Sequence, residues 1–152
     1  PPPHSYSSAA SDVYKRQLAK ELVLPKQTGR AGLLYALGSI ILTAKAYNVI
    51  TLDGVFNGIS DEEGLRSEAE EGKNMGYDGK TLIHPNQIGI TNAVFSPTEK
   101  EIDLANKIIE AYEKAKEEKS GVTTVDGVLV EELHVKQSLA LISKMKMIQS
   151  MS

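Results

Sequence analysis

The chain has 152 residues, a hydrophobic content of 41%, a formal net charge of −3 and no cysteine. These values are typical of one ordinary globular domain, and the missing thiols exclude disulfides, cysteine-ligated metals and cysteine nucleophiles. The isoelectric point near 5.7 and the interleaved acidic and basic side chains leave no basic surface for nucleic acid. No apolar run approaches the roughly 18 residues that cross a bilayer, so we expect a cytoplasmic protein that binds neither nucleic acid nor membrane.

The first 17 residues differ in composition from the rest of the chain. They contain three prolines and four serines without a periodic apolar pattern, so they cannot bury enough surface to offset the entropy of ordering. The segment SDVYKRQ at its end also resembles a translated adaptor sequence. We therefore predict a disordered, non-native tail over residues 1–17 and exclude it from the fold.

Helices and strands alternate in the next part of the chain. Apolar residues recur every three or four positions over residues 30–47 and predict a helix, and the β-branched run 48–53 predicts a strand. Ser60 and a glutamate three residues later have the spacing of a capping box, which opens a helix over residues 60–75. Residues 81–84 then predict a second short strand. This order indicates a βα repeat.

The C-terminal part is predicted to contain two helices and a hairpin. Residues 96–99 combine a serine N-cap, a proline at the first helical position and a capping glutamate, and they open a long helix that Gly121 ends. Residues 122–130 predict a hairpin with an Asp-Gly turn at 126–127. A final helix begins at about Glu131.

Two motif-like segments lack residues that their chemistry needs. Residues 79–81 read Gly-Lys-Thr, but Asn74 stands where a phosphate-binding loop needs a glycine. The segment from Asp53 has features of a calcium-binding loop, but Gly64 stands at its twelfth position, where a bidentate glutamate is needed. The histidines are too scattered to indicate a triad or a metal cluster.

Polar residues follow both predicted strands. Asp53-Gly54-Val55 ends the first strand, and His84-Pro85 followed by Gln87 ends the second. In a barrel of such repeats the carboxyl ends of the strands face the ligand, which makes these residues candidates for binding. Spacing alone favours simpler interpretations, a turn after Asp53 and a structural histidine at position 84.

Six segments together resemble one enzyme family. They are residues 18–22, 51–56, 61–64, 75–87, 95–97 and 125–127. Their sequences, above all Gly-Lys-x-x-Ile-His-Pro-x-Gln followed by Phe-Ser-Pro, resemble the C-terminal half of the citrate lyase beta subunit-like CoA ester lyases of the HpcH/HpaI aldolase superfamily. The resemblance implies an α/β fold, with the last two strands and helices of a TIM (β/α)8 barrel over residues 18–94 and a C-terminal helical lid extension over 95–152.

The resemblance also implies an activity. These enzymes use Mg²⁺ to cleave or form the C–C bond of a 3-hydroxyacyl-CoA such as malyl-, citramalyl- or citryl-CoA, because the metal polarises the oxo-acid carbonyl while the acyl-CoA forms an enolate. The implied partners are an acyl-CoA thioester, a small 2-oxo acid and further copies of the chain. In the implied trimer or hexamer, the lid of one subunit reaches the active site of a neighbour.

The resemblance also implies roles for individual residues of this sequence. Substrate or CoA binding is implied for Asp53, Gly54, Val55, His84, Pro85 and Gln87. Glu131 matches a lid aspartate that acts as acid or base, although this glutamate is longer by one methylene. By spacing alone, Glu131 is a first-turn acid that the helix dipole favours.

The metal ligands of the family are predicted to be missing. Relatives read Gly-Thr-Asn-Asp before the Leu-x-Lys-Glu-Leu match, and their last aspartate binds Mg²⁺, whereas Gln17 precedes Leu18 here. In the relatives, the second metal carboxylate and a substrate-binding arginine lie on strands that precede the part matched by this chain. We therefore expect a C-terminal fragment that is inactive alone. The alternatives are a non-catalytic CoA-binding or oligomer-assembly module, and a 2-oxoacid aldolase without CoA, against which the extension after Pro97 argues.

Overall fold

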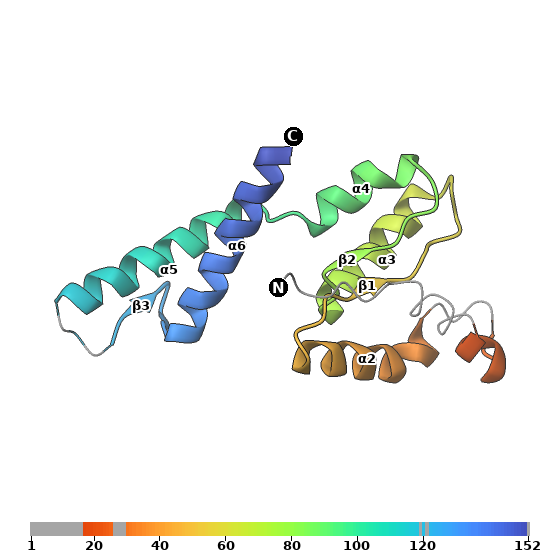
Figure 1. Cartoon of the computed structure of the whole chain (residues 1–152), viewed down its shortest axis with the longest axis horizontal. Helices are drawn as coiled ribbons and strands as arrows, with labels where there is room; N and C mark the ends of the chain where they lie inside the picture. Colours follow the sequence, from red (N-terminus) through yellow and green to blue (C-terminus); the bar gives the residue numbers. More distant parts are fainter. Residues whose placement is uncertain (1–16, 26–29, 119, 121, 152) are drawn as a thin grey trace. The chain divides into compact units, whose positions relative to one another are not determined.

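The computed structural model describes residues 17–25, 30–118, 120 and 122–151, and the chain divides into two units (Figure 1). The first unit ends at Phe95 and contains η2 (Ala31–Leu33), α2 (Leu34–Ala46), β1 (Leu52–Asp53), α3 (Glu62–Met75), β2 (Gly79–Lys80) and α4 (Asn86–Phe95). The second unit begins at Ser96 and contains α5 (Glu99–Glu117), β3 (Thr124–Val125), β4 (Val128–Leu129) and α6 (Glu132–Met151). The predicted tail lies outside the described residues except Gln17, which begins a short helical segment over 17–21.

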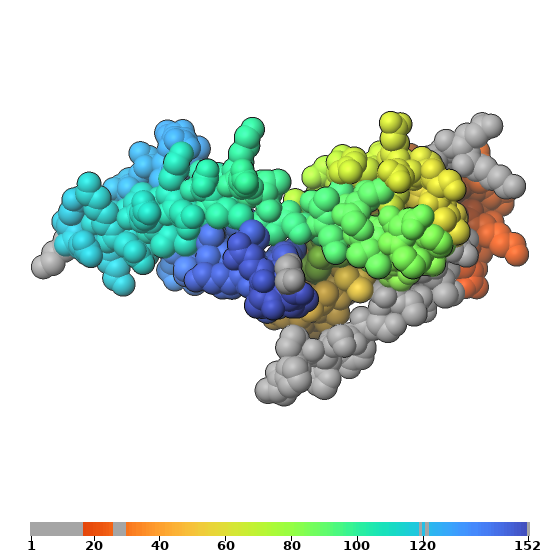
Figure 2. Space-filling view, turned by 90° about the horizontal axis from the view of Figure 1, so that it is seen from above, coloured from red at the N-terminus to blue at the C-terminus, as the bar shows by residue number. Residues whose placement is uncertain are grey.

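The first unit is a β-α-β-α arrangement. Strands β1 and β2 pair in parallel, with Leu52 opposite Gly79 and Asp53 opposite Lys80. Parallel strands need a crossover connection, which helix α3 supplies. Helices α3 and α4 lie side by side in both views (Figures 1 and 2). The predicted α/β character is therefore confirmed.

The core of the first unit is built from one face of each helix. Leu33, Leu37 and Ile41 recur every four residues and are buried, as the predicted helix over 30–47 requires. Leu65 and Ala69 of α3 are also buried. The apolar side chains on the other face of α2 are exposed.

The second strand is two residues earlier than the predicted strand over 81–84. The backbone N–H of Thr81, directly after β2, donates to the carbonyl of Asp53 at 2.9 Å. Two residues later the N–H of Ile83 donates instead to the side chain of Gln87. Because this N–H bonds to a side chain, the chain leaves the sheet and turns into α4.

Two helix caps also differ from the predicted ones. Asp61, rather than Ser60, caps α3 by accepting from the N–H of Gly64. Thr98, rather than Ser96, caps α5, and it forms a complete capping box with Glu101. An N-cap residue has a non-helical backbone, and that of Thr98 is extended, with ψ of 157°.

Other predicted ends agree only in part. The strand predicted over 48–53 is limited to β1 at Leu52–Asp53, and α5 ends at Glu117, whereas Gly121, its predicted end, lies outside the described residues.

The end of α3 and the hairpin agree with their prediction. Gly76 ends α3 in the left-handed conformation, with φ of 104°, which glycine adopts without strain. Strands β3 and β4 form the predicted hairpin, with Thr124 opposite Leu129. Its turn residues Asp126 and Gly127 both have positive φ, as a two-residue hairpin turn requires.

The second unit joins this hairpin to a pair of helices. Helices α5 and α6 lie side by side (Figures 1 and 2), and Ala105, Ala115 and Ser138 are buried on them. Within the ranges that the structure describes, no helix combines the length and the hydropathy needed to cross a membrane.

Candidate functional site

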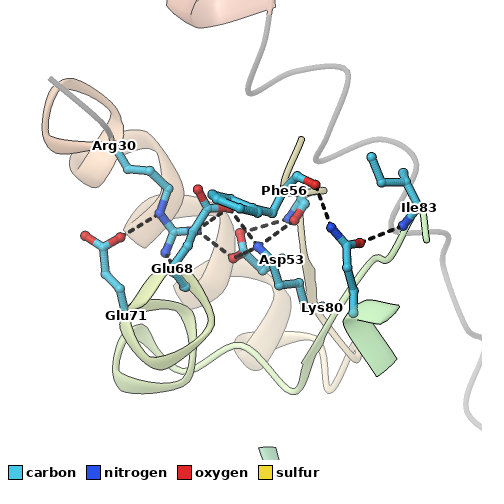
Figure 3. Close-up of polar contacts among 9 residues, drawn as sticks. Arg30, Asp53, Phe56, Glu68, Glu71, Lys80 and Ile83 are labelled. Carbon is cyan, nitrogen blue, oxygen red and sulfur yellow. Dashed lines mark hydrogen bonds and ion pairs between the residues drawn. The ribbon is translucent and has the colours of Figure 1, made fainter. Parts of the chain in front are cut away.

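Charged side chains gather at the carboxyl ends of β1 and β2 (Figure 3). We call this group the strand-end cluster; it comprises Arg30, Asp53, Glu68, Glu71 and Lys80. Its members come from four places in the chain, the segment before η2, the end of each strand and helix α3. Two cations thus face three carboxylates inside the first unit.

Asp53 lies at the centre of the strand-end cluster and its side chain is 0% exposed. Its Oδ2 accepts from Arg30 Nη1 at 2.6 Å and from Lys80 Nζ at 2.9 Å. Its Oδ1 accepts from the N–H of Gly54 at 2.8 Å. Both oxygens of this buried carboxylate are therefore bonded within the protein, as a buried charge requires.

Lys80 is the second fully buried charge, with a side chain that is 0% exposed. Its ammonium donates to Asp53 Oδ2, to the carbonyl of Gly54 at 2.8 Å and to Glu68 Oε1 at 2.7 Å. A lysine ammonium has three donors, and three acceptors surround it here. Lys80 thus joins the end of β2 to the end of β1 and to α3.

Arg30 closes the strand-end cluster from the segment before α2. Its Nε donates to Glu71 Oε2 at 2.8 Å, while Nη1 donates to Asp53. Burial by itself would lower the pKa of the Arg30 guanidinium, but Asp53, Glu71 and Glu68 together raise this pKa above its ordinary value. Arg30 is therefore a permanent cation whose position depends on the carboxylates around it.

Tyr77 lies close to the same charges. Its hydroxyl is buried and has no hydrogen-bond partner among the described residues. Burial raises the pKa of the Tyr77 phenol to about 12, and the charge of Asp53 adds to this shift while that of Arg30 opposes it. The phenol thus stays neutral at physiological pH.

The loops that follow the two strands are linked by Gln87. This side chain is 1% exposed; its Nε2 donates to the carbonyl of Phe56 at 3.0 Å, and its Oε1 accepts from the N–H of Ile83 at 3.1 Å. His84 has a local role, because its Nδ1 accepts from the N–H of Asn86 at the start of α4. This bond is local to the turn between β2 and α4.

The opposite edge of the sheet carries a second, more exposed charged group. Asp78 Oδ2 accepts from the N–H of Thr51 at 2.8 Å, and its Oδ1 accepts from Lys45 Nζ. Burial acts to raise the pKa of Asp78, but Lys45 and Thr51 outweigh it and leave this pKa below its ordinary value of 3.8. This group stabilises the amino ends of the strands.

The structure brings six of the predicted site residues to one edge of the sheet. Asp53, Gly54, Val55 and Gln87 are buried, His84 is half-buried and Pro85 is exposed. Glu131 belongs to the second unit, where it is exposed and its N–H donates to Nδ1 of His134 at 3.0 Å. The side chains of His84 and Pro85 are therefore more accessible than those of the other four.

Sequence analysis missed most of the strand-end cluster. Arg30 lies 23 residues from Asp53 and no short motif connects them. Lys80 appeared in the rejected phosphate-loop motif and in the Gly-Lys-x-x-Ile-His-Pro-x-Gln resemblance, but neither assigned it a role. The signal that could have found it is positional, because Asp53 and Lys80 occupy matching positions at the ends of two adjacent parallel strands.

An apolar hollow on the first unit is separate from these residues. It is lined by Ser39, Ile40, Thr43, Ala44, Tyr47 and Val49. None of them belongs to the strand-end cluster or to the predicted site. The hollow therefore adds nothing to the chemistry at the carboxyl ends of the strands.

The strand-end cluster does not fit a magnesium ion. Mg²⁺ takes an octahedral set of oxygen ligands, but Oδ2 of Asp53 already accepts from Arg30 and Lys80, and Glu68 accepts from Lys80. In the described part of the chain, no three acidic or histidine side chains are grouped so that they could hold a metal. The donor set of this cluster is that of an ion-pair network.

The chain is similar in structure to a solved protein and in sequence to curated relatives. The structure of CitE from Mycobacterium tuberculosis, in complex with magnesium, acetoacetate and coenzyme A, matches with a TM-score of 0.69 and 23% identity, over 87% of this chain and 50% of that chain. This likeness shows the fold, an α/β fold of the citrate lyase type.

Two curated relatives are more similar in sequence. A (3S)-malyl-CoA thioesterase of Cereibacter sphaeroides is 50% identical over 126 residues, 81% of this chain and 44% of that protein. The citrate lyase subunit beta of Leuconostoc mesenteroides subsp. cremoris is 43% identical over 99 residues, 65% of this chain and 33% of that protein. The chain thus spans less than half the length of these relatives. The family described as HpcH/HpaI aldolase/citrate lyase matches residues 15–85, and the chain belongs to this family.

Proposed function

We propose that the chain supplies part of the acyl-CoA site of a CoA-ester lyase or thioesterase. The observation that carries this proposal is the link between the two loops at the carboxyl ends of β1 and β2, where Lys80 bonds to Gly54 and Gln87 bonds to Phe56. In α/β folds with parallel strands, ligands bind at this edge. The predicted binding residues Gly54, Val55 and Pro85 lie on these two loops.

Two reactions are consistent with the relatives. A lyase breaks the C–C bond of a 3-hydroxyacyl-CoA of the malyl, citramalyl or citryl type and releases an acyl-CoA and a small 2-oxo acid. A thioesterase adds water to the thioester and releases free CoA and the hydroxy acid. The citrate lyase subunit supports the first reaction, and the malyl-CoA thioesterase, at 50% identity, supports the second.

The remaining parts of the proposal concern the whole enzyme. We propose that β1 and β2 are strands of a TIM barrel over residues 18–94 and that residues 95–152 form a lid. In a cytoplasmic homo-oligomer, Glu131 of this lid would act as acid or base in the active site of a neighbouring subunit. The magnesium in the CitE complex supports a Mg²⁺-dependent reaction. Because the strand-end cluster does not fit Mg²⁺, the metal would be held by residues other than these, and we expect this chain alone to bind a CoA ester without turnover.

Binding is tested by titrating the isotope-labelled 152-residue chain with CoA and recording amide chemical shifts. We expect saturable shifts at residues 54–57 and 83–87, because these residues form the two linked loops. Saturable shifts confined to the second unit, or no shifts at millimolar CoA, would refute the proposed site. Val122 and Val128, exposed residues of the second unit, provide internal reference signals.

Turnover distinguishes the reactions and the non-catalytic alternative. The chain is incubated with malyl-CoA and Mg²⁺, and acetyl-CoA, 2-oxo acid and free thiol are measured together. Binding without any product is expected for the chain alone and also fits a CoA-binding or assembly module. Acetyl-CoA release would contradict the expected inactivity and support the lyase, whereas free thiol with malate would support the thioesterase.

A further inference from the structure

We infer that Lys80 and Gln87 are positioning residues that together hold the loop after β1, residues 54–56, in one conformation. The inference rests on the proposed function in that this loop is part of the proposed acyl-CoA site. It assigns neither side chain a contact with the ligand.

The side chains of Lys80 and Gln87 are both buried. Lys80 is 0% exposed in its side chain and Gln87 is 1% exposed, so neither presents a surface to a bound molecule. Each ammonium donor of Lys80 has an acceptor within 2.9 Å. Lys80 therefore has no spare donor for a phosphate or a carboxylate.

The two side chains donate to backbone carbonyls at opposite ends of the loop after β1. Lys80 donates to the carbonyl of Gly54 and Gln87 donates to the carbonyl of Phe56, so the two side chains bond the loop at its first and last residues. The N–H of Gly54 is bonded in turn to Asp53, which Lys80 contacts. The backbone at Val55, between these two carbonyls, is thus fixed from both sides by residues of the β2–α4 segment.

The charges explain why a lysine suits position 80. A neutral donor could bond to the Gly54 carbonyl, but Lys80 also offsets the buried charge of Asp53 and that of Glu68. A buried carboxylate without a cation would be costly, and Arg30 reaches Oδ2 of Asp53 from the other side. The loop conformation is therefore coupled to the ion pairs of the strand-end cluster.

The test measures hydrogen exchange of single amides in Gln87→Met, which keeps the side-chain length and removes both hydrogen bonds. The N–H of Ile83 loses its own acceptor and is expected to exchange faster for that reason alone. The informative amide is Gly54, which does not bond to Gln87. We expect it to exchange about tenfold faster or more, because one buried hydrogen bond of the loop is lost.

The matched control is Gln137→Met, the same substitution at an exposed position of α6, which should leave both amides unchanged. Lys80→Met is the second variant, with Lys107→Met on α5 as its exposed control. It should increase Gly54 exchange more than Gln87→Met does, provided that the protected amides of α3 show that the unit remains folded. Unchanged exchange at Gly54 in Gln87→Met would overturn the inference, whether or not the lysine variant folds.

CoA affinity separates this inference from the proposed function. If the unmodified chain binds CoA, Gln87→Met should weaken binding about tenfold, and full affinity together with a loosened loop would overturn the positioning role. If the unmodified chain does not bind CoA, the proposed site is refuted. The Gly54 exchange rates then decide alone whether Lys80 and Gln87 hold the loop.

Discussion

The two edges of the β1–β2 sheet each carry an aspartate, but the two aspartates are held differently. Asp53, at the carboxyl edge, is 0% exposed in its side chain and accepts from two cations and one backbone N–H. Asp78, at the amino edge, is 36% exposed and accepts from Lys45 and from Thr51. Both carboxylates are fully bonded, so the number of bonds is not what distinguishes them.

The difference lies in access to solvent. Water can replace a lost partner of Asp78, because that carboxylate is partly exposed, and exposed ion pairs contribute little to stability. Water cannot reach Asp53 in the same way, so removal of one partner leaves a buried charge without compensation. The carboxyl edge, where parallel α/β folds bind ligands, is thus the edge at which the arrangement of charges is most costly to change.

The largest effect is expected for Asp53→Asn. Asparagine has one oxygen where the carboxylate has two bonded oxygens, so its NH₂ group must face a donor of Gly54, Arg30 or Lys80. We expect the free energy of unfolding to fall by about 3–5 kcal/mol, measured by urea denaturation with circular dichroism.

Its control is Asp103→Asn on the exposed face of α5, which should change stability by less than about 0.5 kcal/mol. A loss of below about 1 kcal/mol in Asp53→Asn would mean that water reaches the strand-end cluster and would remove the contrast between the two edges.

A smaller effect is expected for Gly72→Ala. A Cβ on Gly72 would lie 3.0 Å from Oδ2 of Asp53, and that oxygen is bonded to two cations and cannot move freely. We expect a loss of about 1–3 kcal/mol from this crowding, although alanine is the better helix former.

Gly89→Ala on α4 is the matched variant, because its added Cβ meets nothing within 4 Å. It should increase stability by about 0.5–1 kcal/mol, and thermal unfolding of both variants measures the difference. If Gly72→Ala were equally stabilising, helix α3 would not pack against a fixed Asp53.

The smallest effect is expected for Asp78→Asn, with a loss of about 1 kcal/mol at pH 7. The folded-state pKa of Asp78 is below its ordinary value of 3.8, so its contribution is present above that pH and is lost as the pH falls through the folded pKa. The difference between wild type and variant should therefore shrink in acid. Urea denaturation at pH 7 and at pH 3 measures this, and a difference that grows in acid would contradict the direction of the shift.

Local sequence patterns predicted the features that neighbouring residues decide. The four-residue recurrence of Leu33, Leu37 and Ile41 indicated the buried face of η2 and α2, and Asp126-Gly127 indicated the hairpin turn. The prediction was wrong at Ser96, because α5 begins two residues later than predicted, where Thr98 and Glu101 form the capping box. The strand predicted over 81–84 was wrong because a side chain, Gln87, takes the N–H that would have continued it.

The sequence by itself determined the family, the α/β order and the two loops that carry the proposed site, because short motifs and periodicities encode them. Only the tertiary structure decided what Asp53, Lys80 and Gln87 do. Arg30 meets Asp53 across 23 residues and Lys80 meets it across 27, and such contacts depend on strand pairing and on the packing of α3. Burial then fixes the consequence, since the same ion pairs in water would contribute little.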